Sequence, residues 1–470
     1  MKVDTVIVGA GSAGLSALRE VRRYTDDFLL VNDGHWGTTC AAVGCMPSKA
    51  LIEAANAFHR RGAFEEFGIR GAQGLSADIP AVLARVRRMR DGFVKGPEAV
   101  PGKLGKRAIS GRARLRGPGR LEVNGETVEA RAIILAPGSS PVVPGPWRDF
   151  GDRILTTDTL FEQADLPRRI AVIGMGAIGV EIAQALARLG LEVAGFDAVE
   201  ALAGIDDPEV LAAFRPLIEA ELALYLGASA EIADAGGALG VTGAGASFEA
   251  DAVLAAMGRR PNIDDLGLET LGVPLDEAGL PEVDPASLRI GELPVFLAGD
   301  ANGSRPLLHE AADEGHIAGR MANPDAEGGG LCRRTPLVIT FSSPQVARVG
   351  PPLSDRGAAD VATGQADFSK QARARMAQTA AGLLRIHADR KTGRLLAAEM
   401  CAPGAEHLAH LLALAVEAEM TVADMLAMPF YHPVLEEGLR SALRDLATDV
   451  AGAGGSDLSD CKAIGHDALD

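Results

Sequence analysis

The feature that most constrains the fold of this chain is a strand, a glycine-rich turn and a helix that occur twice. Val3 to Val8 reads as a buried strand, and Gly9-Ala-Gly-Ser-Ala-Gly14 is the turn after it. The same order returns 165 residues later, where Ile170 to Ile173 is the strand and Gly174-Met-Gly-Ala-Ile-Gly179 is the turn. The expected helices are Leu15 to Arg23 and Val180 to Leu189. Two such units predict two Rossmann-like α/β domains.

Each turn has the three glycines that dinucleotide binding requires. The first makes the tight turn, the second lets the backbone approach a pyrophosphate, and the third lets helix and strand pack closely. The pyrophosphate then lies at the positive N-terminus of the helix. A single turn of this kind also arises for packing alone, but two in full context favour two bound dinucleotides. The candidate binding residues are Gly9, Gly11 and Gly14 in the first turn and Gly174, Gly176 and Gly179 in the second.

The residue that closes the next strand of the later unit favours NAD. Asp197 follows Gly174 by 23 positions, so its carboxylate can accept hydrogen bonds from the ribose hydroxyls. Further carboxylates follow with no arginine or lysine in the stretch, and they would repel the 2′-phosphate of NADP. These carboxylates are Glu200, Asp206 and Asp207.

The corresponding position of the first unit carries an amide. The same offset from Gly9 falls on Asn32, and Asp33 is the next residue. Because an asparagine side chain can also hydrogen-bond a hydroxyl, we expect Asn32 or Asp33 to contact the ribose of the first dinucleotide.

Two cysteines follow the first unit, in Gly37-Thr-Thr-Cys-Ala-Ala-Val-Gly-Cys-Met-Pro-Ser-Lys49. A cytosolic cysteine is most often a buried small hydrophobic residue, but the four-residue gap between Cys40 and Cys45 beside a nucleotide-binding turn favours a redox pair. A helix expected from about Met46 to Arg60 would lower the pKa of a nearby thiolate. The remaining thiols have no partner at a useful spacing and are interpreted as inert or exposed. They are Cys332, Cys401 and Cys461.

Composition and charge exclude several other classes of protein. The net charge of −17 argues against a nucleic acid or an anionic membrane surface as a partner. The chain opens without a signal peptide and has no apolar run of the ~20 residues that a membrane span requires, which predicts a cytoplasmic protein. Five unevenly spaced cysteines do not make a structural disulfide framework, so a disulfide in this reducing compartment would be catalytic. No metal site is expected.

The character of the sequence changes after Gly328-Gly-Gly330. Before it, strand-and-glycine segments such as Ile133 to Gly138 and Val295 to Asp300 belong to the nucleotide-binding part. After it, strands and amphipathic helices predict an α+β domain. The expected strands lie in Val338 to Val349 and Gly382 to Met400, and the expected helices are His407 to Ala427 and Leu435 to Leu446.

The ordered set of motifs resembles the FAD-dependent pyridine nucleotide-disulfide oxidoreductases, and among them it looks most like the dihydrolipoamide dehydrogenases. The set comprises the two turns, the cysteine pair, Gly258-Arg-Arg-Pro-Asn262, Gly299-Asp300 and His432-Pro433. The resemblance implies an α/β fold with two Rossmann-like domains, for non-covalent FAD and for NAD, and an α+β C-terminal dimerisation domain. It also implies a homodimer whose active sites each draw on both chains. The implied boundaries are 1–147 and 271–330 for the FAD domain, 148–270 for the NAD domain, 331–450 for the dimerisation domain and 451–470 for a flexible tail.

The resemblance assigns roles to particular residues. Cys40 exchanges with the substrate, and Cys45 contacts the flavin. Lys49 and Glu181 pair beside the flavin. His432 and Glu437 form a dyad that carries protons in the partner's active site, a role that suits a histidine oriented by a carboxylate. The implied FAD contacts are Gly9, Gly11, Gly14, Asn32, Asp33, Thr39, Gly138, Asp300 and His309, and the implied NAD contacts are Gly174, Gly176, Gly179, Asp197 and Gly258.

The implied reaction is the oxidation of dihydrolipoamide, or of a dihydrolipoyl group on a protein, with NAD through FAD and the Cys40/Cys45 disulfide. A first alternative is an NAD(P)H-dependent reductase of another small disulfide, of mercuric ion or of a reactive oxidant, although no arginine cluster for a charged disulfide is visible in the motifs. A second alternative is a non-redox FAD-binding assembly subunit. Pro137 and Val434 depart from the family's commonest motifs and leave the substrate open.

Overall fold

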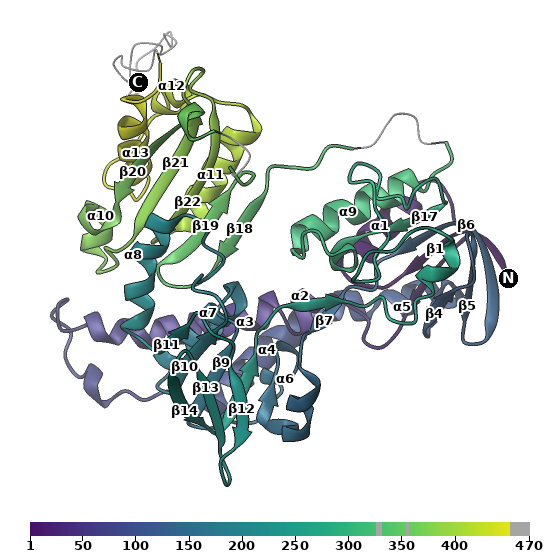
Figure 1. Cartoon of the computed structure of the whole chain (residues 1–470), viewed down its shortest axis with the longest axis horizontal. Coiled ribbons are helices and arrows are strands. Elements are labelled where there is room, and N and C mark those ends of the chain that lie inside the picture. Colours follow the sequence, from purple (N-terminus) through teal and green to yellow (C-terminus); the bar gives the residue numbers. More distant parts are fainter. Residues whose placement is uncertain (326–330, 354–356, 452–470) are drawn as a thin grey trace. The chain divides into compact units, whose positions relative to one another are not determined.

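The computed structural model describes residues 1–325, 331–353 and 357–451, and the chain divides into two compact units (Figure 1). The first unit comprises residues 1–51, 78–166 and 254–333, and the second comprises 52–77, 167–253 and the residues from 334 onward. Residues 452–470 lie outside the described residues; they are most of the predicted tail and include Cys461. The predicted domain boundaries within the units stay a prediction. Among the described helices, none has both the length and the apolar character needed to cross a membrane.

The first unit is built on a mixed sheet with the strand order β3-β2-β1-β6-β5-β4, and β17 also pairs with β6. The strands β1, β2, β3 and β17 are parallel to β6, whereas β4 and β5 form an antiparallel extension. Val6 and Ile7 of β1 are fully buried, because a parallel strand is covered on both faces. The bounds are β1 Lys2–Val8, β2 Phe28–Asn32, β3 Ala108–Ser110, β4 Ala113–Leu115, β5 Arg120–Val123, β6 Glu126–Leu135 and β17 Val295–Leu297.

Two helices of this unit, α1 (Ser12–Val21) and α9 (Leu308–Met321), lie side by side (Figure 1). A Cβ atom on Gly315 would come within 2.0 Å of the carbonyl oxygen of Ala13, so the backbones approach too closely for any other residue there. Three more helices follow β2 along the chain. They are α2 Thr39–Ala42, α3 Cys45–His59 and α4 Ile79–Glu98.

The second unit contains the later glycine turn in a sheet where β11, β10, β9 and β15 are neighbours in that order, and where β9, β10 and β11 are parallel. A separate antiparallel sheet, β12-β13-β14, belongs to the same part of the chain. The predicted strand and helix around the turn are present. The bounds are β9 Arg169–Ile173, α7 Ala177–Arg188, β10 Glu192–Asp197, α8 Pro208–Glu219, β11 Ala223–Leu226, β12 Glu231–Asp234, β13 Leu239–Gly243, β14 Ala246–Ala250 and β15 Ala252–Ala255.

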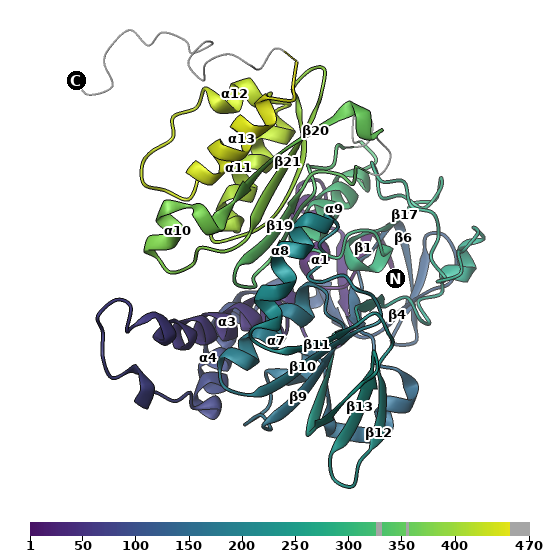
Figure 2. The same ribbon diagram turned by 60° about the vertical axis from the view of Figure 1, so that its left-hand side comes forward.

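The C-terminal part of the second unit is an antiparallel sheet with the order β18-β19-β22-β21-β20. The helices α11 and α13 cover one face of the sheet, and α8 packs against the other (Figure 1; Figure 2). Four residues of α13 at helical spacing, among them Leu439 and Leu446, are fully buried in this core. The bounds are β18 Leu337–Thr340, β19 Gln345–Val349, β20 Val361–Asp367, β21 Leu383–Asp389, β22 Leu395–Ala402, α11 Ala405–Glu417, α12 Val422–Leu426 and α13 Glu437–Ala447.

One predicted helix is wrong in extent. The single helix expected over His407 to Ala427 is two helices, α11 and α12. Glu419 has a φ of +56°, which ends the first helix, and Thr421 starts the second with a reciprocal capping box to Asp424. The apolar periodicity runs through both helices and therefore did not reveal the break.

Candidate active site

The first glycine turn has the shape that a dinucleotide needs. Gly9 has a φ of +104°, and a Cβ on it would come within 2.0 Å of the Ala136 carbonyl oxygen. A Cβ on Gly14 would lie 1.8 Å from the oxygen of Gly9, whereas one on Gly11 would meet no atom within 4 Å. Within the described residues no side chain caps the N-terminus of α1 and its first turn has no acidic residue. The turn therefore leaves open space beside uncapped N–H groups, which fits a diphosphate.

Asn32 closes β2 and supports this turn. Its Oδ1 accepts a hydrogen bond of 2.9 Å from the backbone N–H of Ala10, and its Nδ2 donates one of 2.9 Å to the carbonyl of His35. The side chain is buried, whereas the next residue, Asp33, is exposed. The ribose contact expected of these two residues stays a prediction.

Asp300 is a further predicted FAD contact of the first unit. Its Oδ2 accepts a 2.7 Å hydrogen bond from the hydroxyl of Ser139, the residue after Gly138, which has a φ of +74°. Glu314, which sequence reasoning missed, fixes the turn before Asp300 because its Oε2 accepts a 2.6 Å bond from the N–H of Gly299. Glu314 is fully buried, and burial raises its pKa.

The remaining predicted FAD contacts are more exposed. Thr39 is the first residue of α2, and His309 is the second residue of α9. Both are solvent-exposed in this chain. Together with the glycine turn and Asp300, the residues of the first unit fit FAD.

The second glycine turn repeats the geometry of the first. Gly174 has a φ of +96°, and a Cβ on Gly176 would meet no atom within 4 Å. Asp197 stands where Asn32 stands in the first unit, since its Oδ2 accepts a 2.6 Å hydrogen bond from the N–H of Met175. Its Oδ1 accepts another, of 3.1 Å, from Val199. The turn and its carboxylate fit NAD.

Glu181 and Lys49 belong to different units of the chain. Glu181 is buried in α7, and its Oε1 accepts a 2.7 Å hydrogen bond from the N–H of Phe341. Lys49 is half-buried on α3. Their pairing stays a prediction, as does the NAD contact of Gly258, which is exposed with a φ of +96°.

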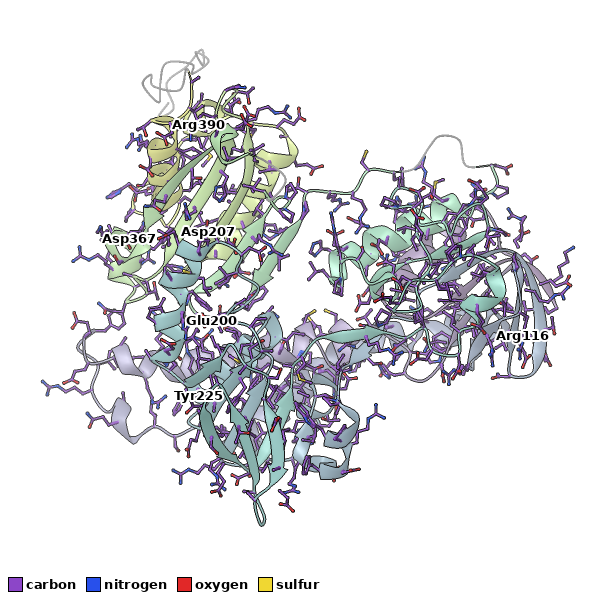
Figure 3. All side chains as sticks on the ribbon, in the orientation of Figure 1. Arg116, Glu200, Asp207, Tyr225, Asp367 and Arg390 are labelled. Atoms are coloured by element: carbon purple, nitrogen blue, oxygen red, sulfur yellow. The ribbon has the colours of Figure 1, made fainter. Side chains whose placement is uncertain are left out.

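The sequence from Asp197 to Asp207 contains no arginine or lysine, but the fold brings arginines from elsewhere to the carboxylates after Asp197. Each carboxylate has an arginine partner: the nearby Arg215 for Glu200, and the distant Arg348 for Asp206 and Arg385 for Asp207. Asp207 caps the N-terminus of α8 and receives two hydrogen bonds, of 2.7 and 2.8 Å, from Arg385 on β21 (Figure 3). Asp206 and Asp207 therefore hold α8 against the C-terminal sheet, and the case for NAD depends on Asp197.

Cys40 and Cys45 are half-buried thiols that hydrogen-bond each other in one tight turn. Cys40 is the second residue of α2, which the side chain of Thr38 caps, and Cys45 is the first residue of α3. A Cβ on Gly44 would lie 3.2 Å from Cα of Cys40, so a glycine at this position lets the turn close.

The expected lowering of thiol pKa is wrong for Cys40. The hydrogen bond that Cys40 makes with Cys45 and, second, burial raise the pKa of Cys40 above its ordinary value. Of the other described thiols, Cys332 is exposed and Cys401 is buried, where burial raises the pKa of Cys401 to about 11.

His432 and Glu437 form a hydrogen-bonded dyad. Nδ1 of His432 lies 3.0 Å from Oε1 and 3.1 Å from Oε2 of the carboxylate. Glu437 is the first residue of α13, as the spacing of five predicts for a loop that leads into a helix. The contact with His432 is the largest cause that holds the pKa of Glu437 below its ordinary value. An anionic carboxylate therefore orients the imidazole and can stabilise its protonated form.

Comparison with known proteins decides the family. The pyridine nucleotide-disulphide oxidoreductase profile matches residues 3–315, and the family's dimerisation domain matches residues 336–443. The chain belongs to the pyridine nucleotide-disulphide oxidoreductases. It is thus a flavoprotein oxidoreductase that uses FAD and NAD(H), and its dimerisation domain supports a homodimer.

Relatives in this family match most of the chain. The chain is 32% identical to the dihydrolipoyl dehydrogenase of Thermus scotoductus, over 94% of this chain and 97% of that protein. It is 31% identical to dihydrolipoyl dehydrogenase 3 of Pseudomonas aeruginosa, with the same coverage.

Solved structures confirm the predicted α/β fold class. The HOCl-induced flavoprotein disulfide reductase RclA of Escherichia coli, in its Cu(II) complex, matches with a TM-score of 0.81 over 94% of this chain and 99% of that one, at 21% identity. LpdA of Mycobacterium tuberculosis matches with the same TM-score and coverage at 27% identity. At 21% identity the RclA likeness concerns the fold alone.

Proposed function

We propose that this oxidoreductase oxidises dihydrolipoamide, or dihydrolipoyl groups carried by a protein, with NAD. The observation that carries the proposal is the hydrogen-bonded thiol pair Cys40 and Cys45 at the N-terminus of α3. The relatives named dihydrolipoyl dehydrogenase support lipoamide as the substrate. A cytoplasmic location, predicted from the sequence, belongs to the same proposal.

The exchange begins with the Cys40–Cys45 disulfide. One substrate thiolate attacks the sulfur of Cys40, the Cys40–Cys45 bond breaks, and Cys45 leaves as a thiolate. The second substrate thiol then attacks the substrate sulfur of the mixed disulfide, which releases the oxidised cyclic disulfide and leaves Cys40 reduced. Two electrons have passed from the substrate to the cysteine pair.

His432 takes the proton from the attacking thiol, and Glu437 stabilises the resulting imidazolium. In this proposal the dyad acts in the active site of the partner subunit of the homodimer. FAD and NAD, when bound at the two glycine turns, supply the transfer of the two electrons from the thiols to the nicotinamide. Asp300 and Asn32 would hold the first cofactor, and Asp197 would hold the second.

The test is a steady-state comparison of dihydrolipoamide and NAD with a panel of disulfides and NADH or NADPH. We expect rapid NAD-dependent oxidation of dihydrolipoamide. Negligible lipoamide turnover beside fast reduction of another disulfide would replace the proposed substrate. A Cys45→Ser variant that kept full turnover would contradict the role of the cysteine pair.

A further inference from the structure

One corner of the C-terminal sheet supports the loop that carries the His432–Glu437 dyad. The corner follows Asp367, the last residue of β20, which Figure 3 labels. It comprises a 3-10 helix, η8 (Phe368–Lys370), and the short helix α10 (Ala372–Met376). Gln371 lies between these two helices, and only 9% of it is exposed. A buried amide must form hydrogen bonds with its N–H donors and its oxygen, so the partners of Gln371 show which segments this side chain holds together.

The amide of Gln371 joins two parts of the fold. Its Oε1 accepts a 2.7 Å hydrogen bond from the N–H of Ala374 and so caps α10. Its Nε2 donates a 2.6 Å hydrogen bond to the carbonyl of Val434, which belongs to the loop between His432 and α13. The cap alone requires only an oxygen at this position. The second bond requires a donor with the length of glutamine.

Val434 connects this amide to the dyad. The N–H of Val434 donates a 3.3 Å hydrogen bond to Oε2 of Glu437, whose carboxylate contacts His432. Phe368, a fully buried residue of the corner, supports the start of α13, because a Cβ on Gly438 would lie 2.5 Å from its ring. The residues on both sides of the carboxylate are therefore held from the same corner.

Within its own chain, the imidazole of His432 has little packing to hold it. Its side chain is 74% exposed in this chain, compared with 30% for Glu437. An exposed side chain keeps one orientation only if its hydrogen-bond partner and its backbone are fixed. Proton transfer is sensitive to that orientation, since a misplacement of about 1 Å can lower a rate by ~10²-fold.

We propose that Gln371 is a positioning residue for the dyad, which fixes Val434 and through it the His432–Glu437 pair. The inference rests on the proposed function, because it concerns the proton transfer that accompanies dithiol oxidation. Among the described residues, the side-chain hydrogen bonds of Gln371 go to Ala374 and Val434 rather than to the dyad itself.

Two substitutions separate the loop contact from the helix cap. Gln371→Asn and Gln371→Glu both keep a side-chain oxygen for the N–H of Ala374. The first has an amide too short to reach Val434, and the second has no donor to offer it. Gln345→Asn is the matched control, since Gln345 is a partly buried amide of the same sheet that bonds Glu406 and not the dyad loop.

In the purified holoenzyme we expect both Gln371 variants to lose about tenfold in kcat/KM for dihydrolipoamide with NAD, and we expect the ascending limb of its pH profile to move. The NADH-dependent reduction of ferricyanide, which requires no dithiol deprotonation, should stay at the wild-type rate. Gln345→Asn should match the wild type in both assays. In a Glu437→Gln background, Gln371→Asn should cause no further loss, because the two residues act on one contact.

Other results would overturn the inference. Wild-type dihydrolipoamide kinetics in both Gln371 variants, beside an impaired Glu437→Gln enzyme, would show that the dyad works without this support. An equal loss of both activities would show a general structural role for Gln371. If Glu437→Gln were itself fully active, the proposed dyad function would fail first and the inference would fail with it.

Discussion

Nδ1 of His432 lies 3.0 Å from the carboxylate of Glu437, and this contact holds the pKa of Glu437 below its ordinary value. The carboxylate is therefore anionic at neutral pH and can stabilise an imidazolium. We expect Glu437→Gln to lower kcat/KM for dithiol oxidation on the order of 10²-fold, the lower end of the range for general acid–base catalysis. Steady-state kinetics against pH measure this effect.

The neighbouring carboxylate provides a control for Glu437. Glu436 precedes α13, and among the described residues the carboxylate that Nδ1 of His432 contacts is that of Glu437. Glu436→Gln should keep the wild-type rate. Equal kinetics for the Glu436 and Glu437 variants would contradict the proton-transfer role of the dyad.

Replacement of Cys45 should change the reactivity of the Cys40 thiol. The Cys45 thiol is the largest cause that raises the pKa of Cys40, so Cys45→Ala should lower that pKa. A lower pKa gives more thiolate at pH 7, and we expect iodoacetamide to alkylate Cys40 of the reduced protein faster in the variant. Mass spectrometry of the labelled peptide measures the rate. Cys332→Ala, which removes an exposed thiol elsewhere, should leave the rate unchanged, whereas an unaltered rate in Cys45→Ala would refute the coupling.

Local spacing allowed much of the site to be predicted from the sequence. A strand, a glycine turn and a helix fix the distance to the next strand end, so the offset of 23 residues correctly placed Asn32 and Asp197 at the two turns. The cysteine pair and the dyad each lie within one short segment, and the resemblance to the family named the residues of the dyad. Roles that require a bound cofactor or a second subunit go beyond this local information.

Contacts between distant segments could not be predicted in this way. Arg385 lies 178 residues from Asp207, and no periodicity of either segment pairs them. Gln371 and Val434 are 63 residues apart, and their contact joins a corner to a loop outside the regular pattern. The pKa of Cys40 depends first on a hydrogen bond with Cys45, which forms only in the folded turn.

We expect the carboxylate of Asp197 to contribute to the affinity for NADH. Its carboxylate accepts hydrogen bonds from Met175 and Val199, which holds it at the end of β10 beside the second glycine turn. Loss of a hydrogen bond from a charged group costs about 1.5–3 kcal/mol, so Asp197→Ala should weaken NADH binding by about 10- to 10²-fold. Calorimetric titration of the flavoprotein measures this affinity.

The control for Asp197 lies on the same strand. Glu192 is the exposed first residue of β10, and Glu192→Ala should bind NADH as the wild type does. Wild-type affinity in Asp197→Ala would place the ribose contact elsewhere.

His387 on β21 makes the stability of the second unit depend on pH. Its ring is largely buried, with Nδ1 2.9 Å from the hydroxyl of Thr363 and Nε2 3.8 Å from Asp207. Burial, the largest cause, lowers the pKa of His387 below its ordinary value, although Asp207 opposes this effect. The unfolded chain therefore binds the proton more tightly than the folded chain. The neutral ring contributes stability above the ordinary pKa of about 6.5, and this contribution is lost as the pH falls through that value toward the lower folded-state pKa.

We therefore expect the melting temperature of the wild type to fall between pH 7.5 and pH 5.5, and to fall less in His387→Gln, which has no ring to protonate. Differential scanning calorimetry of both proteins at the two pH values measures the difference, and carboxylates that titrate in this range contribute equally to both. His410→Gln, which changes an exposed histidine of α11, should retain the wild-type decrease. If His387→Gln lost as much stability on acidification as the wild type, the buried ring would not be the group that senses the proton.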